Sequence, residues 1–600
     1  MRYPSPSRSL PVWTSAIVCL ALAASGAALA STTTTNPAHA ATVATAQSQS
    51  AGQHATTQKP SKRERAMYQR FMQMLRKGPY PPPPTRAQML AGAYGPYRAN
   101  NDLLYYHLSL RVDPTTKAVR GNNVIRFRML KDGKRIQIDL QQPLKIDRIM
   151  FDKHTLTYQR EDGAVFIEFP RTLHKGKVYA IDFFYSGTPR HHGRFGDFTF
   201  GTDPYGHPWI VTACESDGSS TWWPSKDQWR DEPQDGMEIS VSIPDGLVDV
   251  SNGKFMGTVK QPGGYTQWNW HVHYPINSYD VALNIGNYVH FSDAYGTYYV
   301  LPQDLAKAKK HFRQVKGMMA AFTHYFGPYP FAKDGYKLVQ VPYLGMEHQS
   351  AVAYGNHFDN GYYVPGRGGI NWTHTPWSMK FDFIIIHESA HEWFGNAITA
   401  ADRADMWIHE GFATYMEALY VEYHWGHKAA LQYLDGLKPK VRNRRPIIAE
   451  HGVDAEPPED EYFKGALMLN TLRSIINNDA RWWKLLHGFY QHFKYQTIDT
   501  DQAVAYFNKH SGMNLTPIFD QYLRHARIPT LDLLFGESPG LVMYKWRAGE
   551  QDFAMPVRVG QSGHWQIIHP TTKWQWMKTP LTKDQFKVAT SLYYINVDKQ

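Results

Sequence analysis

Two histidines and a glutamate at helical spacing provide the clearest chemistry in this sequence of 600 residues. His387 and His391 are four positions apart, so on a helix they share one face and can bind one metal ion. Glu388 lies beside them and is placed to act as a general base on water. The apolar run at 383–386 predicts that this helix is buried. The pattern H-E-x-x-H therefore points to metal-assisted hydrolysis.

A catalytic zinc site needs a third protein ligand and an open position for water. Glu410 is the candidate, because it lies in the motif W-x-x-E-G-F-A-x-Y, with eighteen residues between it and His391. That distance allows the first helix to end and a second helix to present Glu410 near its start. The metzincin pattern needs Gly and His where Phe394 and Ala397 stand, so that class of site is excluded.

This combination of motifs resembles the M1 family of gluzincin aminopeptidases, which includes alanyl aminopeptidases and leukotriene hydrolase. The sequence H-E-W-F-G-N that begins at His391 also matches, with Glu392 where many members have Gln. The resemblance covers roughly residues 95–575. It implies one Zn²⁺ per chain, with His387, His391 and Glu410 as metal ligands, and it implies Glu388 as the catalytic base.

A motif that resembles the family's G-x-M-E-N lies upstream, at Gly345, Met346 and Glu347, with Leu344 and His348 in place of its first Gly and its Asn. The resemblance implies that these residues bind substrate and that Glu347 holds the free α-ammonium of a peptide. A cationic amine that enters a partly dry cleft needs an anionic partner, which agrees with this role.

Two further residues complete the predicted site. Tyr462 lies in the motif Y-x-K-G-A, and the resemblance implies that its phenol donates a hydrogen bond to the tetrahedral oxyanion. Glu215 follows Cys214 in A-C-E-S and is predicted as a second substrate-binding anchor for the amine; the alternative is a surface carboxylate. Cys214 itself is expected to be a small buried hydrophobe, because no histidine is paired with it.

The pattern of apolar residues divides the chain. Alternating segments such as 104–112 and 123–129 predict strands, whereas helices are expected later, at 305–325, 378–396, 410–425, 465–476 and 482–491. The predicted fold class is multidomain α+β. The resemblance implies a β saddle domain at 95–292, a thermolysin-like, mainly helical catalytic domain at 293–528, and a small C-terminal β-sandwich at 529–600.

The N-terminus reads as a secretory signal peptide over residues 1–30, with Arg2 and Arg8 before an apolar stretch and a small-x-small cleavage site at Ala28 to Ala30. Residues 31–94 are expected to form a disordered leader, a short basic helix at 62–77 and a Pro-rich linker. The mature protein is therefore predicted to be exported, either to the periplasm or out of the cell. No other segment is apolar and long enough to span a bilayer.

Composition narrows the function classes. Hydrophobic residues make up 42% and charged residues 20%, which is typical of a globular enzyme. The net charge of +11 is not gathered in a basic stripe interleaved with aromatic residues, so no nucleic-acid partner is predicted. We expect a zinc aminopeptidase that removes N-terminal residues from peptides by metal-activated water. The alternatives are a zinc endopeptidase or epoxide hydrolase on the same scaffold, or an inactive peptide-binding protein.

Overall fold

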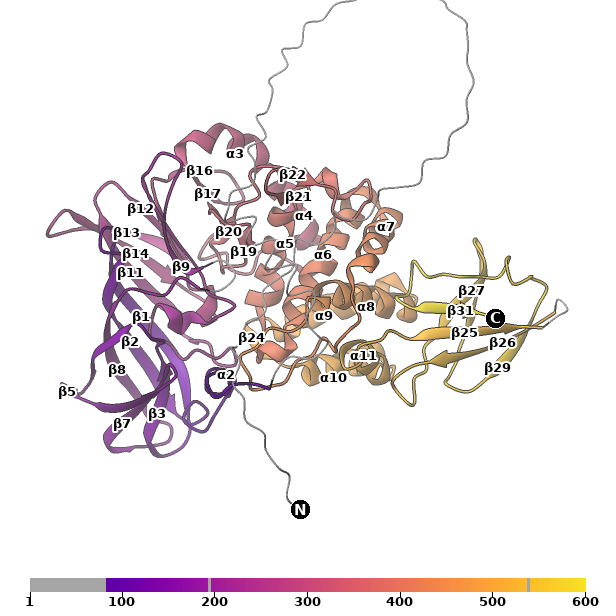
Figure 1. The fold of residues 1–600 in the computed structure, drawn as a ribbon, viewed down its shortest axis with the longest axis horizontal. Coiled ribbons are helices and arrows are strands. Elements are labelled where there is room, and N and C mark those ends of the chain that lie inside the picture. The colour runs from indigo at the N-terminus through magenta and orange to yellow at the C-terminus, as the bar shows by residue number, and fades with distance from the viewer. Residues whose placement is uncertain (1–82, 193–195, 537–539) are drawn as a thin grey trace, which may run out of the picture.

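The computed structural model describes residues 83–192, 196–536 and 540–600. Three parts follow one another along the chain in Figure 1: a β-rich N-terminal part, a mainly helical central part and a C-terminal β part. The predicted multidomain α+β class is confirmed, while the exact domain boundaries stay predictions. The predicted signal peptide, the basic helix and most of the leader lie outside the described residues.

The N-terminal part is built on an eight-stranded sheet of order β13-β14-β11-β1-β2-β8-β4-β5. Alternate residues of β1 are buried, as its sequence alternation predicts, and β1 pairs with β2 in antiparallel and with β11 in parallel register. The strands are β1 (Asn101–Asp113), β2 (Ala118–Met129), β4 (Lys145–Phe151), β5 (His154–Thr155), β8 (Val178–Gly187), β11 (Met237–Pro244), β13 (Lys254–Gln261) and β14 (Tyr265–Val272).

Two smaller sheets complete this part, with orders β3-β7-β6 and β12-β15-β10-β9. β10 matters most for the site, because it ends two residues before Glu215. The strands are β3 (Gly133–Asp139), β6 (Thr157–Glu161), β7 (Ala164–Leu173), β9 (Asp197–Thr202), β10 (Pro208–Ala213), β12 (Val248–Ser251) and β15 (Leu283–Gly286). A short helix, α2 (Arg86–Gly92), precedes β1.

The central part begins with a five-stranded sheet that the sequence pattern did not predict. Its order is β16-β17-β18-β20-β19, and each strand has at most four residues, which is too short for a clear alternation. β19 carries the Gly345–Met346 motif at the edge of this sheet. The strands are β16 (Val289–Ser292), β17 (Thr297–Val300), β18 (Lys337–Gln340), β19 (Gly345–Met346) and β20 (Val352–Tyr354).

Two of the predicted helices are interrupted. The helix expected at 305–325 is two helices, because the chain breaks between α3 (Leu305–His311) and α4 (Gln314–Phe326). The helix expected at 378–396 is shorter, since α5 (Phe383–Ala390) starts at the N-cap Asp382 and ends in the wider turn η5 (Glu392–Asn396). Within η5, Gly395 has a φ of +133°, which no helix accommodates.

The other predicted helices are present and longer than expected. They are α6 (Trp407–Trp425), α8 (Asp460–Ile476) and α9 (Asp479–Phe493). α6 and α8 touch where two glycines meet, because a Cβ on Gly465 would lie 2.8 Å from the Cα of Gly411. This close approach brings the first turn of α8, with Tyr462, beside the start of α6. Further helices of the central part are α7 (His427–Leu437), α10 (Thr500–Ser511) and α11 (Thr516–Leu523).

The C-terminal part has a four-stranded sheet of order β29-β26-β25-β31 and a three-stranded sheet of order β28-β27-β30. Its strands are β25 (Thr530–Phe535), β26 (Gly540–Arg547), β27 (Val557–Gln561), β28 (His564–Ile568), β29 (Gln575–Thr579), β30 (Lys587–Val588) and β31 (Asn596–Lys599). Across the described residues, no helix has the length and apolar character that a bilayer crossing requires.

Candidate metal centre and catalytic site

Two helices bring the three predicted metal ligands together. His387 and His391 project from α5 and its C-cap, and their Nε2 atoms are 3.3 Å apart. Glu410 comes from the first turn of α6, and its Oε2 lies 3.2 Å from Nε2 of His387 and 3.4 Å from Nε2 of His391. All three side chains are buried. The predicted helix–turn–helix arrangement of the ligands is therefore present.

The hydrogen bonds around this cluster fit a metal ion at its centre. His387 Nδ1 lies 2.7 Å from Oε1 of Glu417, and His391 Nδ1 lies 3.1 Å from the carbonyl oxygen of Phe394. Both acceptors require a proton on Nδ1, so each neutral ring turns the lone pair of Nε2 towards Glu410. Glu410 Oε2 is buried and accepts no hydrogen bond. Two imidazole nitrogens and one carboxylate oxygen form a ligand set for one zinc ion.

Charge balance at the cluster points the same way. Burial lowers the pKa of His391, but the nearby carboxylates of Glu347 and Glu410 raise it to about 9. Burial likewise lowers the pKa of His387, and its contacts with Glu410 and Glu417 raise it well above the usual value. The pKa of Glu410 is lowered, because His391 and His387 outweigh its burial. The carboxylates thus favour positive charge between the two histidines and Glu410, and a bound divalent cation would supply that charge.

Glu417 was not among the residues predicted from the sequence. It lies seven residues after Glu410 on α6, and its second oxygen accepts a 2.5 Å hydrogen bond from the hydroxyl of Tyr433 on α7. A carboxylate that holds the distal nitrogen of a histidine ligand fixes the ring and increases its basicity. The signal for it was available, since a spacing of seven places Glu417 on the same helix face as Glu410.

Glu388, the predicted base, is buried and lies beside His391 and Glu347. Burial raises its pKa to about 7, although His387 and His391 act in the opposite direction. Gly345 packs against it, because a Cβ at that position would lie 2.6 Å from Oε1 of Glu388. The predicted substrate motif therefore touches the predicted base directly, and a glycine is the residue that leaves room for the carboxylate.

The two predicted amine anchors come from different parts of the chain and meet at the site. Ligand atoms of Glu215, Glu347 and Glu410 all lie within 4.8 Å of one another. Burial raises the pKa of both Glu347 and Glu215, and the mutual repulsion of the carboxylates adds to the rise for Glu215. Tyr279, which no sequence motif indicated, donates a 3.1 Å hydrogen bond to Oε1 of Glu347.

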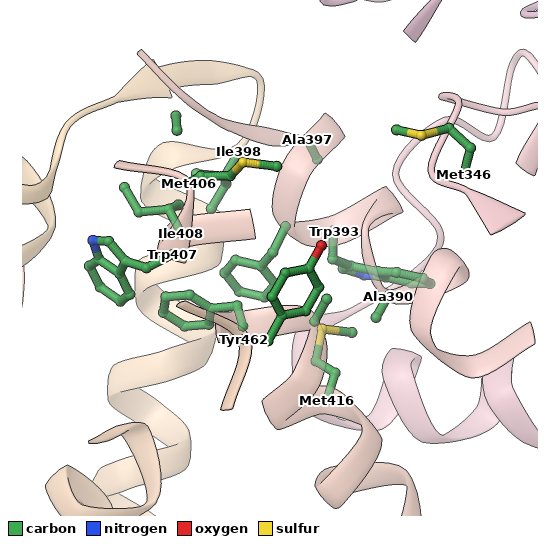
Figure 2. Close-up of a cluster of buried hydrophobic side chains, with 14 of the residues drawn as sticks. Met346, Ala390, Trp393, Ala397, Ile398, Met406, Trp407, Ile408, Met416 and Tyr462 are labelled. Carbon is green, nitrogen blue, oxygen red and sulfur yellow. The ribbon is translucent and has the colours of Figure 1, made fainter. Parts of the chain in front are cut away.

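The remaining predicted residues lie close to the same centre. The ring of Tyr462 is nearly parallel to that of His387, with 5.9 Å between the ring centroids. Figure 2 shows Tyr462 among buried side chains that include Trp393, Trp407 and Met416, and it shows Met346 farther to the right in the same view. Every residue predicted for the site is therefore found around the cluster, although their chemical roles remain predictions.

His348, which stands where the family has Asn, is fully buried. Burial lowers its pKa to about 3, so its imidazole is neutral at physiological pH. The substituted position thus brings no extra charge to the site. Next to it, Glu347 is held from the metal side, because Asn396 donates a 2.7 Å hydrogen bond to its backbone carbonyl.

Comparisons with known proteins agree with these features. A family model described as "Peptidase family M1 domain" matches residues 312–522, and one described as "Peptidase M1 N-terminal domain" matches residues 103–279. Together the two ranges span more than half of the chain.

Aminopeptidase B of Rattus norvegicus is 24% identical over 291 residues, which are 44% of this chain and 41% of that protein. Leukotriene A-4 hydrolase of Xenopus laevis is 20% identical over 425 residues, which are 67% of each chain. The chain thus spans about two fifths of the length of the aminopeptidase B relatives that it matches.

Among solved structures, an M1 zinc metallopeptidase variant from Deinococcus radiodurans with bound Tyr-Ser-Ala has a TM-score of 0.58 and 19% identity. The match covers 73% of this chain and 98% of that one. This likeness supports the observed fold.

Proposed function

Because the chain belongs to peptidase family M1, as its motifs predicted, we propose that it is a zinc-dependent aminopeptidase. The observation that carries the proposal is the meeting of two sets of groups. The ligand set His387, His391 and Glu410 lies directly beside a second cluster of carboxylates that includes Glu347. The first set serves hydrolysis, and the second suits a free amino terminus.

When bound, the zinc ion supplies Lewis acidity towards a carbonyl and lowers the pKa of water. Glu388 supplies the proton transfers. Burial raises the pKa of this carboxyl above its usual range, which suits a group that takes a proton from the attacking water and later delivers it to the leaving amine. Its buried setting against Gly345 holds the carboxylate in one place. Tyr462 donates its phenolic proton in a hydrogen bond to the developing oxyanion, since a phenol is neutral at working pH.

Glu347 and Glu215 determine which end of a peptide can be cut. The α-ammonium of a substrate pairs with these two carboxylates, one buried and one half-buried, and it stabilises their charged forms in return. A peptide held by its free N-terminus presents its first peptide bond to the metal centre. Removal of one residue at a time follows from this arrangement, whereas a zinc endopeptidase on the same scaffold would not need the free amine.

The substitution Glu388→Gln tests the proposed mechanism. We expect the variant to retain one zinc ion per chain, because Glu388 is not a ligand, and to lose about 10²–10⁴-fold in kcat on aminoacyl chromogenic substrates. Metal content measured by atomic emission and steady-state kinetics provide the two readouts. Full activity of this variant would falsify the assignment of the base.

The choice of substrate separates the alternatives. An aminopeptidase should cleave a peptide with a free N-terminus and leave its N-acetylated form intact, since acetylation removes the charge that Glu347 and Glu215 pair with. Equal cleavage of both forms would instead indicate the endopeptidase. Bound zinc without turnover of any aminoacyl substrate in the panel would support the inactive peptide-binding protein.

A further inference from the structure

A pocket of about 730 Å³ that is separate from the catalytic site lies between the N-terminal and central parts. Its walls come from β13 and β14 on one side, and from β17, α4 and the loop 328–336 on the other. None of the residues that we place in the catalytic site lines it. Its volume is within the range of pockets that hold small organic ligands, roughly 300–1,000 Å³.

A buried lysine without an acidic partner lies in the wall of this pocket. The ammonium of Lys337 donates a 2.6 Å hydrogen bond to the carbonyl of Gly253, and it lies 5.5 Å from the centre of the Trp270 ring. Lys337 itself and both of these neighbours line the pocket. No carboxylate among the described residues forms an ion pair with Lys337.

The carboxylates nearest to Lys337 are already engaged. Asp334 accepts hydrogen bonds from the backbone and the ring of His273. Glu392 accepts hydrogen bonds from the backbone of Ser350 and from the hydroxyl of Tyr329. An ammonium has three protons to donate, and leaving a buried charge unpaired is costly. An anionic group from a ligand would complete its coordination.

The other walls of the pocket are aromatic. Trp270 and Tyr336 are buried and Tyr329 is half-buried, whereas Phe255 and Tyr295 are more open, with 42% and 37% of their surface exposed. Flat rings favour stacked or edge-to-face contact with another ring, so these walls suit an aromatic ligand. The acidic Asp293 at the pocket accepts hydrogen bonds from the backbone of Tyr295 and Gly296.

We propose that this pocket binds a small aromatic monocarboxylate, with the ammonium of Lys337 holding the carboxylate and the aromatic walls holding the ring. The pocket is also connected to the metal helix. Tyr336 and Ser389 on α5 form a 2.6 Å hydrogen bond, and Tyr329 donates a 3.1 Å hydrogen bond to Glu392 in η5. A ligand here contacts the two tyrosines that hold the far side of the zinc-binding helix.

Binding of N-acetyl-tryptophan and of its neutral amide, measured by isothermal titration calorimetry on the zinc-loaded protein, tests the proposal. We expect the acid to bind about tenfold more tightly than the amide, because a hydrogen bond between an ammonium and a carboxylate is stronger than one to a neutral amide. In Lys337→Met the two ligands should bind equally. Lys254→Met is the matched control, since this exposed lysine lines the same pocket and should leave the preference unchanged.

A second variant addresses the case in which Lys337→Met fails to fold. Ala320 is an exposed residue of α4 that lines the pocket, so Ala320→Trp fills the space without disturbing the core. It should weaken binding of the acid at least tenfold while the thermal unfolding temperature stays close to that of the wild type. The proposal is wrong if the acid keeps its advantage over the amide in Lys337→Met, or if it keeps its wild-type affinity in Ala320→Trp, because the acid then binds elsewhere, for instance at the zinc.

Discussion

Glu417 is not a predicted metal ligand, but it fixes the orientation of one, His387. Its carboxylate holds Nδ1 of His387 at 2.7 Å and is itself held by Tyr433 at 2.5 Å. The ring of His387 can therefore present its lone pair in one direction without rotating. Because this chain of contacts is buried, water cannot replace a missing partner.

We predict that Glu417→Gln weakens zinc affinity about 10–100-fold, since an amide is a poorer acceptor for the imidazole proton. Competition with a chromophoric chelator measures this affinity directly. Tyr433→Phe is the matched comparison and should have a smaller effect, because it removes a donor to the carboxylate and leaves the contact with His387. Unchanged zinc affinity in Glu417→Gln would contradict the role given to this contact.

Asp249 on β12 is one of the buried carboxyls that make folding stability depend on pH. It is fully buried, and burial raises its pKa to about 8, although Trp270 and Ser251 donate hydrogen bonds to it. An unfolded aspartate titrates near pH 4. The folded state therefore binds the extra proton, and its contribution to stability is complete below about pH 4 and is lost as the pH rises towards 8.

Asp249→Asn cannot ionise, so we expect it to unfold at a higher temperature than the wild type at pH 8. The margin should shrink as the pH falls to 5, because the wild-type carboxyl becomes protonated. Differential scanning calorimetry at both pH values measures the two differences. Asp245→Asn is the control: its exposed carboxylate has a lowered pKa through Thr266 and Lys260, so no gain is expected at pH 8. A margin that does not change with pH would refute the argument.

Among the structural elements, the turn η5 determines how the ring of the second histidine, His391, is oriented. The chain leaves the helix at Phe394 and Gly395, and this departure directs the Phe394 carbonyl onto Nδ1 of His391. Gly395 has a φ of +133°, and a Cβ there would lie 3.0 Å from Nδ1 of His391. The glycine is therefore required both by the backbone and by the ring.

We predict that Gly395→Ala destabilises the fold by about 1–3 kcal/mol and also lowers zinc occupancy. Gly426 separates the two effects, because it has a φ of +86° but a Cβ added there would meet no atom within 4 Å. Gly426→Ala should cost a comparable amount of stability and keep full zinc occupancy. Urea unfolding and metal analysis provide the measurements, and full zinc binding in Gly395→Ala would show that the ring contact is unimportant.

The elements that the sequence predicted well are those with a long repeat. The burial alternation of β1 extends over thirteen residues and is therefore clear, and α6 has nineteen residues, which is too long for a strand. Short elements carried no such signal, which explains why the strands β16 to β20 were missed. The break in the helix expected at 378–396 depends on Asp382 as N-cap and on Gly395, and a periodicity count overlooks both.

At the scale of the whole molecule, the site is formed by residues from both the N-terminal and the central parts. The motifs predicted the metal ligands because their spacing is local, whereas Glu215 reaches Glu410 only through tertiary packing. Arg403 links the N-terminal part to the central part. Its guanidinium donates 2.7 Å hydrogen bonds to the carbonyl of Ser216, in the N-terminal part, and to Asp454, in the central part. Nothing in the local sequence marked this arginine.

We predict that Arg403→Met lowers the free energy of unfolding by about 1.5–3 kcal/mol, because it removes a buried guanidinium and its charge-assisted hydrogen bonds from two half-buried carboxylates. It should also raise KM for free-amine substrates more than it lowers kcat, since the Ser216 contact holds the segment that carries Glu215. Calorimetry and steady-state kinetics test the two effects. Arg86→Met, which removes an exposed ion pair with Glu161, should leave both quantities almost unchanged. If Arg403→Met kept the wild-type KM, the contact between Arg403 and Ser216 would not contribute to substrate binding. The position of Glu215 would then depend on β10 and not on this contact.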